Sequence, residues 1–181
     1  MTASRKNPGN PQGKPAPILI ALGGNLPSKA GGADLTLRAA LDDLHASGVI
    51  VENCSRFYRS APVPISDQPD FINAVARVST DLAPAALLTL LHEIEARFER
   101  VRAERNAART LDLDLLTYGN LVSDLPILPH PRLAERAFVL LPMQDVVPDF
   151  IHPISGLRLA DMVAALPPGQ VCLPMEAARM T

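Results

Sequence analysis

The chain has 181 residues, of which 48% are hydrophobic and 20% charged. This length allows one domain with a sizeable core, and the composition is typical of a globular rather than a disordered protein. The formal net charge of −2 gives no basic surface overall, which argues against nucleic acid as a partner. No apolar run approaches the roughly 18 residues of a membrane span, and two cysteines form no disulfide framework. We therefore predict a cytoplasmic protein with no membrane partner. We also expect a monomer, although nothing in the composition determines the oligomeric state.

The hydrophobic pattern divides the chain into a leader and one domain. Residues 1–16 offer almost nothing to bury, so we expect a flexible leader there and a single domain over 17–181. Within the domain the pattern predicts, in chain order, a strand over 17–22, a helix over 35–44, strands over 49–58 and 71–79, a helix from 83 to about 102 and a strand over 109–116. The order βαββαβ is the signature of a ferredoxin-like α+β sheet with helices packed on one face. A C-terminal extension follows, with a helix expected from Ala134.

The most informative segment is Leu111-Asp112-Leu113-Asp114-Leu115. On a strand, residues two apart share a face, so the leucines should enter the core while both carboxylates emerge on the other side. The two aspartates would then lie about 7 Å apart between Cα atoms, where they repel unless a cation is near. Oxygen ligands of this kind suit Mg²⁺ bound together with substrate phosphates. The alternative is a solvated edge strand with two unrelated aspartates.

Arginines concentrate just before this strand, at positions 97, 100, 102, 105 and 109. One interpretation is a charged helix face, since Glu93 and Arg97 have the i,i+4 spacing of a helical ion pair. However, the arginines continue beyond the predicted helix as far as the acidic strand, and guanidinium groups recognise phosphate oxygens. The sequence has no P-loop motif. The residues alone therefore predict a magnesium–nucleotide or phosphoryl-transfer enzyme.

The acidic segment also resembles a known signature. Arg109 to Leu116, followed by Tyr118-Gly119-Asn120, is similar to the motif of the 6-hydroxymethyl-7,8-dihydropterin pyrophosphokinase family of folate biosynthesis. Further segments resemble the same family in the same order: Leu22 to Leu26, Phe57 to Val75, and Pro129 to Pro142. The resemblance covers residues 17–155 and implies a ferredoxin-like fold, in agreement with the predicted element order.

The resemblance implies a reaction and a set of residues. Pyrophosphate would pass from ATP to the hydroxymethyl group of 6-hydroxymethyl-7,8-dihydropterin, with release of AMP. Asp112 and Asp114 would hold two Mg²⁺ ions bound with ATP, and Arg100 and Arg109 would be catalytic together with them. The positions that match nucleotide-binding residues are Glu95, Arg102, Arg109, Leu115, His130 and Arg136.

The pterin should lie between two aromatic rings, because a flat heterocycle gains from stacking. The matching positions are Phe71 and Phe138, and Asn73 can both donate to and accept from a pterin edge. Ser60, Ala61 and Val63 would complete that edge. Without the resemblance, Phe71 on an alternating strand is more simply a core residue, and His130 is a surface-loop histidine.

The chain departs from the family pattern in two loops. Glu99 stands where the family usually carries glycine before its first loop arginine, and Asn106-Ala107-Ala108 replaces Trp-Gly-Pro. In the first loop, Gly24 stands where serine is usual. Two alternative functions agree less well with these residues. A non-catalytic ferredoxin-like ligand-binding module has no use for paired carboxylates beside arginines, and the near-neutral charge argues against a metal-dependent nuclease.

Overall fold

The computed structural model describes residues 16–62, 66–99 and 108–176. Its elements are β1 (Ile18–Gly24), α1 (Ala33–Ala46), β2 (Ile50–Cys54), β3 (Tyr58–Ser60), β4 (Phe71–Ser79), α2 (Pro84–Arg97), β5 (Asp112–Tyr118), β6 (Ser123–Asp124), β7 (Ile127–Leu128), a 3-10 turn at Leu133–Glu135, α3 (Ala137–Val146), α4 (Leu159–Ala164) and β8 (Cys172–Pro174). Within these described residues, no helix is long and apolar enough to cross a membrane. The predicted leader lies outside the described residues except for its last residue, Ala16.

The main sheet has the strand order β5-β1-β4-β3-β8, and β2 also pairs with β4. All of these pairings are antiparallel. When β2 and β3 are taken as two parts of one strand, the order is fourth, first, third, second, which is that of a ferredoxin-like sheet. The predicted fold class is confirmed.

The predicted strand over 49–58 is wrong in one respect, because it is interrupted between β2 and β3. Ser55 causes the break: its hydroxyl accepts from the Val75 N–H and donates to the Arg56 carbonyl. A side chain therefore replaces part of the backbone ladder there. The interruption lets β3 begin anew at Tyr58 and pair with the start of β4.

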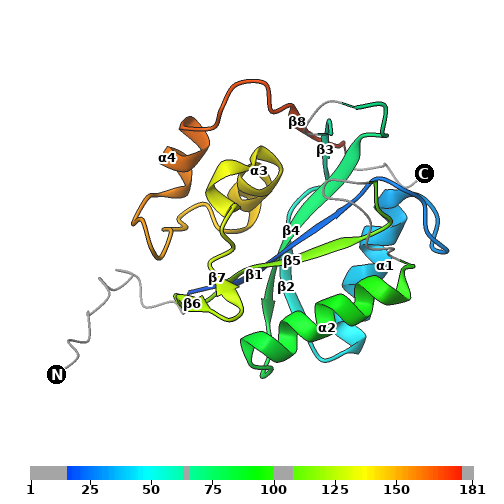
Figure 1. The fold of residues 1–181 in the computed structure, drawn as a ribbon, viewed down its shortest axis with the longest axis horizontal. Coiled ribbons are helices and arrows are strands. Elements are labelled where there is room, and N and C mark those ends of the chain that lie inside the picture. The colour runs from blue at the N-terminus through cyan, green and yellow to red at the C-terminus, as the bar shows by residue number, and fades with distance from the viewer. Residues whose placement is uncertain (1–15, 63–65, 100–107, 177–181) are drawn as a thin grey trace.

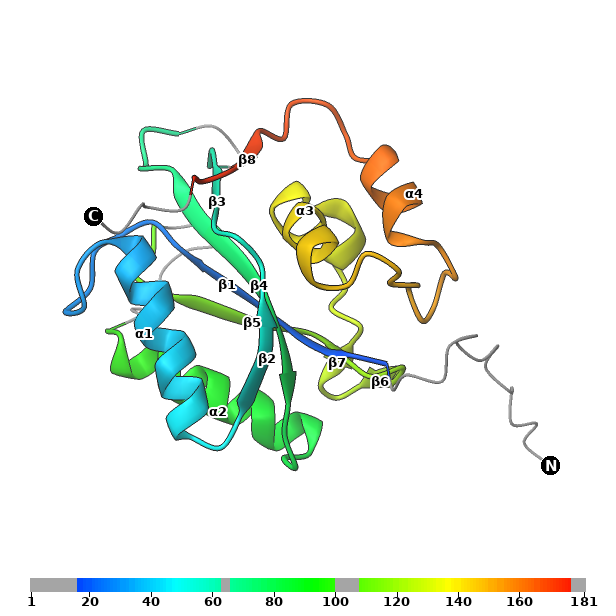
Figure 2. The same ribbon diagram turned by 180° about the vertical axis from the view of Figure 1, so that it is seen from behind.

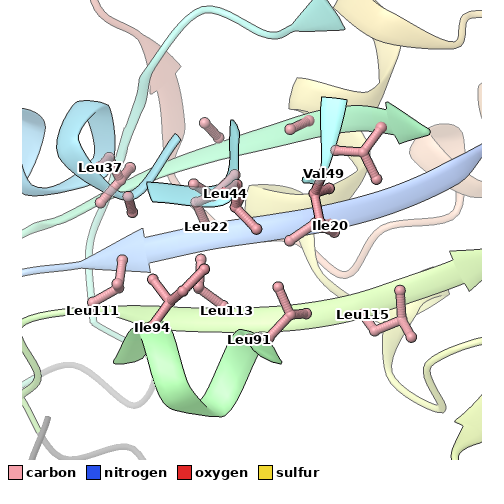
Figure 3. Close-up of a cluster of buried hydrophobic side chains, with 14 of the residues drawn as sticks. Ile20, Leu22, Leu37, Leu44, Val49, Leu91, Ile94, Leu111, Leu113 and Leu115 are labelled. Atoms are coloured by element: carbon pink, nitrogen blue, oxygen red, sulfur yellow. The ribbon is translucent and has the colours of Figure 1, made fainter. Parts of the chain in front are cut away.

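One face of the sheet is covered by α1 and α2 (Figures 1 and 2). The core on this side contains the three leucines of the acidic segment, as predicted, together with side chains from β1 and both helices (Figure 3): Ile20, Leu22, Leu37, Leu44, Leu91, Ile94, Leu111, Leu113 and Leu115. Since neighbouring residues of a strand point to opposite faces, Asp112 and Asp114 lie on the other side of the sheet.

The opposite face carries the C-terminal extension. Figures 1 and 2 show α3 and α4 on the side of the sheet away from α1 and α2. Leu19, Val75 and Leu116 point to this side and form a second core with α3 and α4. The prediction that helices pack on one face of the sheet is therefore correct for α1 and α2. The C-terminal extension covers part of the other face. The rest of that face is left for the carboxylates.

Two element ends differ from the prediction around the arginine-rich segment. Helix α2 ends at Arg97 rather than near 102, and Glu99 has φ = 60°. A residue in the left-handed region just beyond a helix stops it, and glycine is favoured there. Strand β5 begins at Asp112 rather than at 109, because the Arg109 carbonyl accepts from the N–H groups of Asn25 and Leu26 instead of joining the ladder.

Candidate active site

The carboxylate face is built by three adjacent strands. Gly23 on the central strand β1 lies opposite Asp112 of β5 on one side and opposite Asn73 of β4 on the other. Ala21 lies opposite Asp114 in the same way. The central strand therefore carries only small residues between the functional side chains. An open pocket results, lined by Ala21, Leu22, Gly23, Asn73, Asp112, Asp114 and Phe138.

Each carboxylate of the pair has a cation beside it. The guanidinium of Arg109 donates to Asp112 Oδ2 over 2.7 Å. Arg136 Nη1 lies 3.6 Å from Asp114 Oδ2, and His130 Nε2 lies 4.0 Å from the same oxygen. The positive charge that the paired aspartates require is thus supplied by one arginine for each.

His130 faces this cluster as a neutral ring. Burial lowers its pKa below the ordinary value, and the nearby Arg136 lowers it further, although Asp114 acts in the opposite direction. Its Nδ1 accepts a hydrogen bond of 3.1 Å from the Arg132 N–H. In the neutral ring the proton is therefore on Nε2, the atom that faces Asp114. The site thus holds a neutral N–H donor beside its carboxylates.

Two aromatic rings border the site, each with an arginine over it. The guanidinium of Arg109 lies 5.5 Å from the ring centroid of Phe71, and that of Arg136 lies 5.4 Å from Phe138. Phe71 is half-buried and belongs to none of the hydrophobic clusters in the described part of the chain. The interpretation of Phe71 as a plain core residue is therefore wrong. Phe138 lies in the first turn of α3.

The Asn73 amide is held in one orientation. Its Nδ2 donates to the Ser60 hydroxyl over 2.9 Å, and both side chains are buried. A Cβ added at Gly23 would lie 3.0 Å from Asn73 Oδ1, so the amide oxygen points toward the central strand. Ala61 directly follows Ser60 and is half-buried, whereas Val63 lies outside the described residues.

Two residues predicted to contact the nucleotide are not brought to this face. The Glu95 carboxylate is 2% exposed on the helix side of the sheet, where it accepts from the Leu113 N–H over 2.7 Å. Leu115 is buried in the helix-side core (Figure 3). Its hydrogen bond joins α2 to β5, and the contact of Glu95 with the nucleotide stays a prediction. Arg100 and Arg102 lie outside the described residues.

A polar cluster beside the site was not predicted. Asp145 of α3 accepts hydrogen bonds from Arg56 Nη2 at 2.8 Å and from the Tyr58 hydroxyl at 3.0 Å. The Arg56 bonds hold the pKa of this carboxyl below its usual range. The cluster joins β3, which leads to Ser60, to the helix that carries Phe138. Since Tyr58 and Asp145 are 87 positions apart, no local pattern in the sequence could reveal it.

Comparisons with known proteins identify the family of this chain. The family model for 7,8-dihydro-6-hydroxymethylpterin-pyrophosphokinase (HPPK) matches residues 19–148. A Pseudomonas aeruginosa protein named 2-amino-4-hydroxy-6-hydroxymethyldihydropteridine pyrophosphokinase is 41% identical over 83% of this chain and 91% of its own length. The Synechocystis protein of the same name is 37% identical over 80% of this chain and 73% of its own. The chain therefore belongs to the HPPK family.

Some relatives are much longer proteins. The folic acid synthesis protein fol1 of Pneumocystis carinii is 39% identical over 79% of this chain, which spans only 19% of that protein. Among solved structures, a triple mutant of Plasmodium falciparum HPPK-DHPS has a TM-score of 0.64 at 14% identity, covering 89% of this chain and 44% of its own. The wild-type protein gives 0.63 at 13% identity, covering 86% and 44%. These structures support the fold.

Proposed function

We propose that the carboxylate face is where this pyrophosphokinase transfers pyrophosphate from ATP to the hydroxymethyl oxygen of 6-hydroxymethyl-7,8-dihydropterin and releases AMP. The observation that carries the proposal is that Asp112, Asp114, Asn73 and Phe138 line the same pocket. Groups suited to a metal–phosphate complex and groups suited to a flat heterocycle therefore face the same space. The reaction needs both substrates side by side, and the two sets of groups on this face would each bind one of them.

The donor set on this face fits Mg²⁺. Two carboxylates with no cysteine beside them are hard oxygen ligands, and substrate phosphates would supply the rest of the coordination. In the described part of the chain, no group of three or more histidine, cysteine, aspartate or glutamate side chains forms a complete metal site. A site that depends on the nucleotide is therefore favoured. Asp112 and Asp114 would hold two Mg²⁺ ions, which would neutralise the phosphates and make the attacked phosphorus more electrophilic.

The arginines would exchange partners when the substrates bind. In this structure Arg109 and Arg136 lie against the carboxylates, and the same guanidinium groups can bind phosphate oxygens instead. His130 adds a neutral Nε2–H donor for a phosphate oxygen. Arg100 and Arg102 belong to the proposal by their match to the family motif, with Arg100 acting on the transferring group.

The pterin would occupy the other part of the pocket. Phe71 and Phe138 would contact its two faces, and the oriented Asn73 amide would read its edge. Ser60 fixes that amide, and the backbone of Ser60, Ala61 and Val63 would complete the contact. Fixing the pterin against the nucleotide aligns the hydroxymethyl oxygen for in-line attack on the β-phosphorus.

The proposal is tested by measuring AMP release from ATP with and without 6-hydroxymethyl-7,8-dihydropterin at saturating Mg²⁺. We expect AMP and the pyrophosphorylated pterin in equal amounts, and almost no AMP without the pterin. Binding of both substrates with no AMP would instead favour the ligand-binding module, and nicking of a plasmid would favour the nuclease.

We also propose that the protein is a monomer in the cytoplasm. Sedimentation of the purified protein tests the proposed monomer, and fractionation of cells tests the cytoplasmic location.

A further inference from the structure

Asn25 occupies a junction between three segments that are distant in the sequence. It follows the last residue of β1 and is 6% exposed. Its Oδ1 accepts from the Arg109 N–H over 2.9 Å, and its Nδ2 donates to the Pro69 carbonyl over 3.0 Å. A longer contact of 3.4 Å joins Nδ2 to Gln68 Oε1. The backbone N–H of Asn25 also donates to the Arg109 carbonyl over 3.0 Å.

The partners of this one amide lead to the two parts of the pocket. Arg109 continues through its side chain to Asp112, at 2.7 Å. Pro69 is followed two positions later by Phe71, the aromatic ring at the start of β4. Asn25 itself is not among the residues that line the pocket. Its amide binds the backbones that lead to the proposed metal side and to the proposed pterin side.

We propose that Asn25 is a positioning residue that couples the nucleotide site to the pterin site. The inference rests on the proposed function, since it assigns the two ligands to the two sides of one pocket. An ordered Arg109 backbone helps to order the segment at Pro69 through the shared amide, and the reverse holds equally. Binding of one ligand should therefore raise the affinity for the other, and this coupling is reciprocal.

The chemistry of the position requires an amide. Only asparagine among side chains of this length both accepts from the Arg109 N–H and donates to the Pro69 carbonyl. The neighbouring backbone leaves little freedom, because a Cβ at Gly24 would lie 2.4 Å from the Thr110 carbonyl oxygen. With the amide removed, the Arg109 N–H and the Pro69 carbonyl would lose their partners in a part-buried place. The Arg109 carbonyl would stay bound to the Asn25 backbone, but the Pro69 segment could then move independently of Arg109.

The experiment measures binding of the pterin and of a non-hydrolysable magnesium–ATP analogue by calorimetry, each alone and each in the presence of the other. The variants are Asn25→Ala, which removes both contacts, and Asn25→Asp, which keeps the acceptor for Arg109 and loses the donated bonds. The matched control is Ser28→Ala. Ser28 lies in the same loop and bonds to the Thr36 hydroxyl and the Ala30 N–H, on the side of α1.

In the parent we expect the analogue to raise pterin affinity at least fivefold, in the range usual for coupled sites. In Asn25→Ala this factor should fall below two. Pterin affinity measured without nucleotide should fall about tenfold in both Asn25 variants, the size expected when a buried hydrogen bond is lost. Ser28→Ala should keep the parental coupling even where its Tm is lowered as much as that of the Asn25 variants.

The inference is overturned if the parent shows no coupling, or if the Asn25 variants keep both the parental coupling factor and the parental pterin affinity. It is also overturned if Ser28→Ala loses coupling to the same extent, since a general loss of stability would then explain the effect. Failure of the proposed function looks different, because the parent itself would bind neither ligand or release no AMP.

Discussion

Arg109 and Asp112 lie three residues apart, and the arginine donates to the carboxylate over 2.7 Å. The same guanidinium lies 5.5 Å from the Phe71 ring centroid. One side chain thus contacts both a proposed metal ligand and a proposed wall of the pterin site. A metal ion that binds Asp112 competes with Arg109 for the carboxylate, and the guanidinium is then free for a phosphate. Without substrate, the ion pair keeps both side chains in the site, where each can later exchange its partner for a metal ion or a phosphate.

Replacing either carboxylate should abolish turnover without unfolding the protein. We expect Asp112→Asn and Asp114→Asn each to lower the rate of AMP release by at least a thousandfold, because a metal ligand is lost. The fold should persist, since asparagine has the same shape, relieves repulsion between two anions, and keeps an oxygen that can accept from the neighbouring arginine. Steady-state rates and thermal unfolding check both points. Near-parental AMP release at saturating Mg²⁺ would contradict the metal assignment.

Asn73→Ala should weaken pterin binding and spare the nucleotide. Loss of the oriented amide should cost about 1–3 kcal/mol of pterin binding free energy. Affinity for the ATP analogue alone should stay within a factor of two. Ser60→Ala makes a graded comparison, because it frees the Asn73 amide to rotate but leaves it in place. Titration calorimetry of the three proteins checks the order parent, Ser60→Ala, Asn73→Ala, and equal affinities would move the pterin site elsewhere.

Glu99→Gly should stabilise the protein. Glu99 holds φ = 60° just beyond α2, where a side chain costs roughly 1–2 kcal/mol. Glycine removes that cost, but it also increases the conformational entropy of the unfolded chain, which offsets part of the gain. The free energy of unfolding measured in urea should therefore rise by about 0.5–1 kcal/mol. Glu93→Gly is the matched control, since Glu93 is exposed within α2 and glycine there should lose about 1 kcal/mol. Equal losses in both variants would refute the left-handed assignment.

Gly24→Ser should harm this chain, although serine is usual at the matching position of the family. A Cβ at Gly24 would lie 2.4 Å from the Thr110 carbonyl oxygen, so the backbone beside Arg109 must shift. We expect a loss of about 1–3 kcal/mol of stability and weaker binding of the ATP analogue. Gly24→Ala introduces the same Cβ without a hydroxyl and should lose as much. Parental stability of both variants would show that the two segments separate without cost.

Asp145→Asn should destabilise the protein only above acidic pH. The pKa of Asp145 is lowered by its bonds to Arg56 and Tyr58, so the charged form is favoured in the folded state. Its contribution to stability is complete above about pH 4 and is lost as pH falls through the lowered pKa. We expect Tm to fall by about 2–4 °C at pH 7, and the difference from the parent to narrow below pH 4. If the Tm difference between variant and parent were the same at every pH, the loss of stability would come from packing rather than from charge.

The sequence predicts most of the fold and the central pair of the site because both depend on local alternation. Leucine–aspartate alternation over 111–115 places each side chain on the correct face. The resemblance adds Asn73, Phe71 and Phe138, which the fold brings to the same side of the sheet. For these residues, the spacing in the chain or the motif is enough to predict on which face of the sheet they lie.

The remainder depends on contacts between distant segments. The orientation of Glu95, whose carboxylate accepts from the Leu113 N–H on the helix side, depends on such a contact, and its nucleotide contact stays a prediction. The role of Asn25 requires that Pro69 and Arg109 both lie beside it, although they are 44 and 84 positions away from Asn25 in the sequence. Likewise, the position of α3 on the free face follows from its packing against Leu19 and Leu116, which no periodicity within α3 specifies.

The central strand of the site contributes no functional side chain, but substitutions in it can still block the site. Gly23 lies opposite both Asp112 and Asn73, and Ala21 lies opposite Asp114. Their small size leaves the space that the side chains on either side require. A substitution such as Ala21→Leu would leave every polar residue in place and fill part of the pocket that Ala21 lines. We expect such a chain to lose activity although all its charged and polar site residues are intact, so a survey of variants limited to those positions would overlook it.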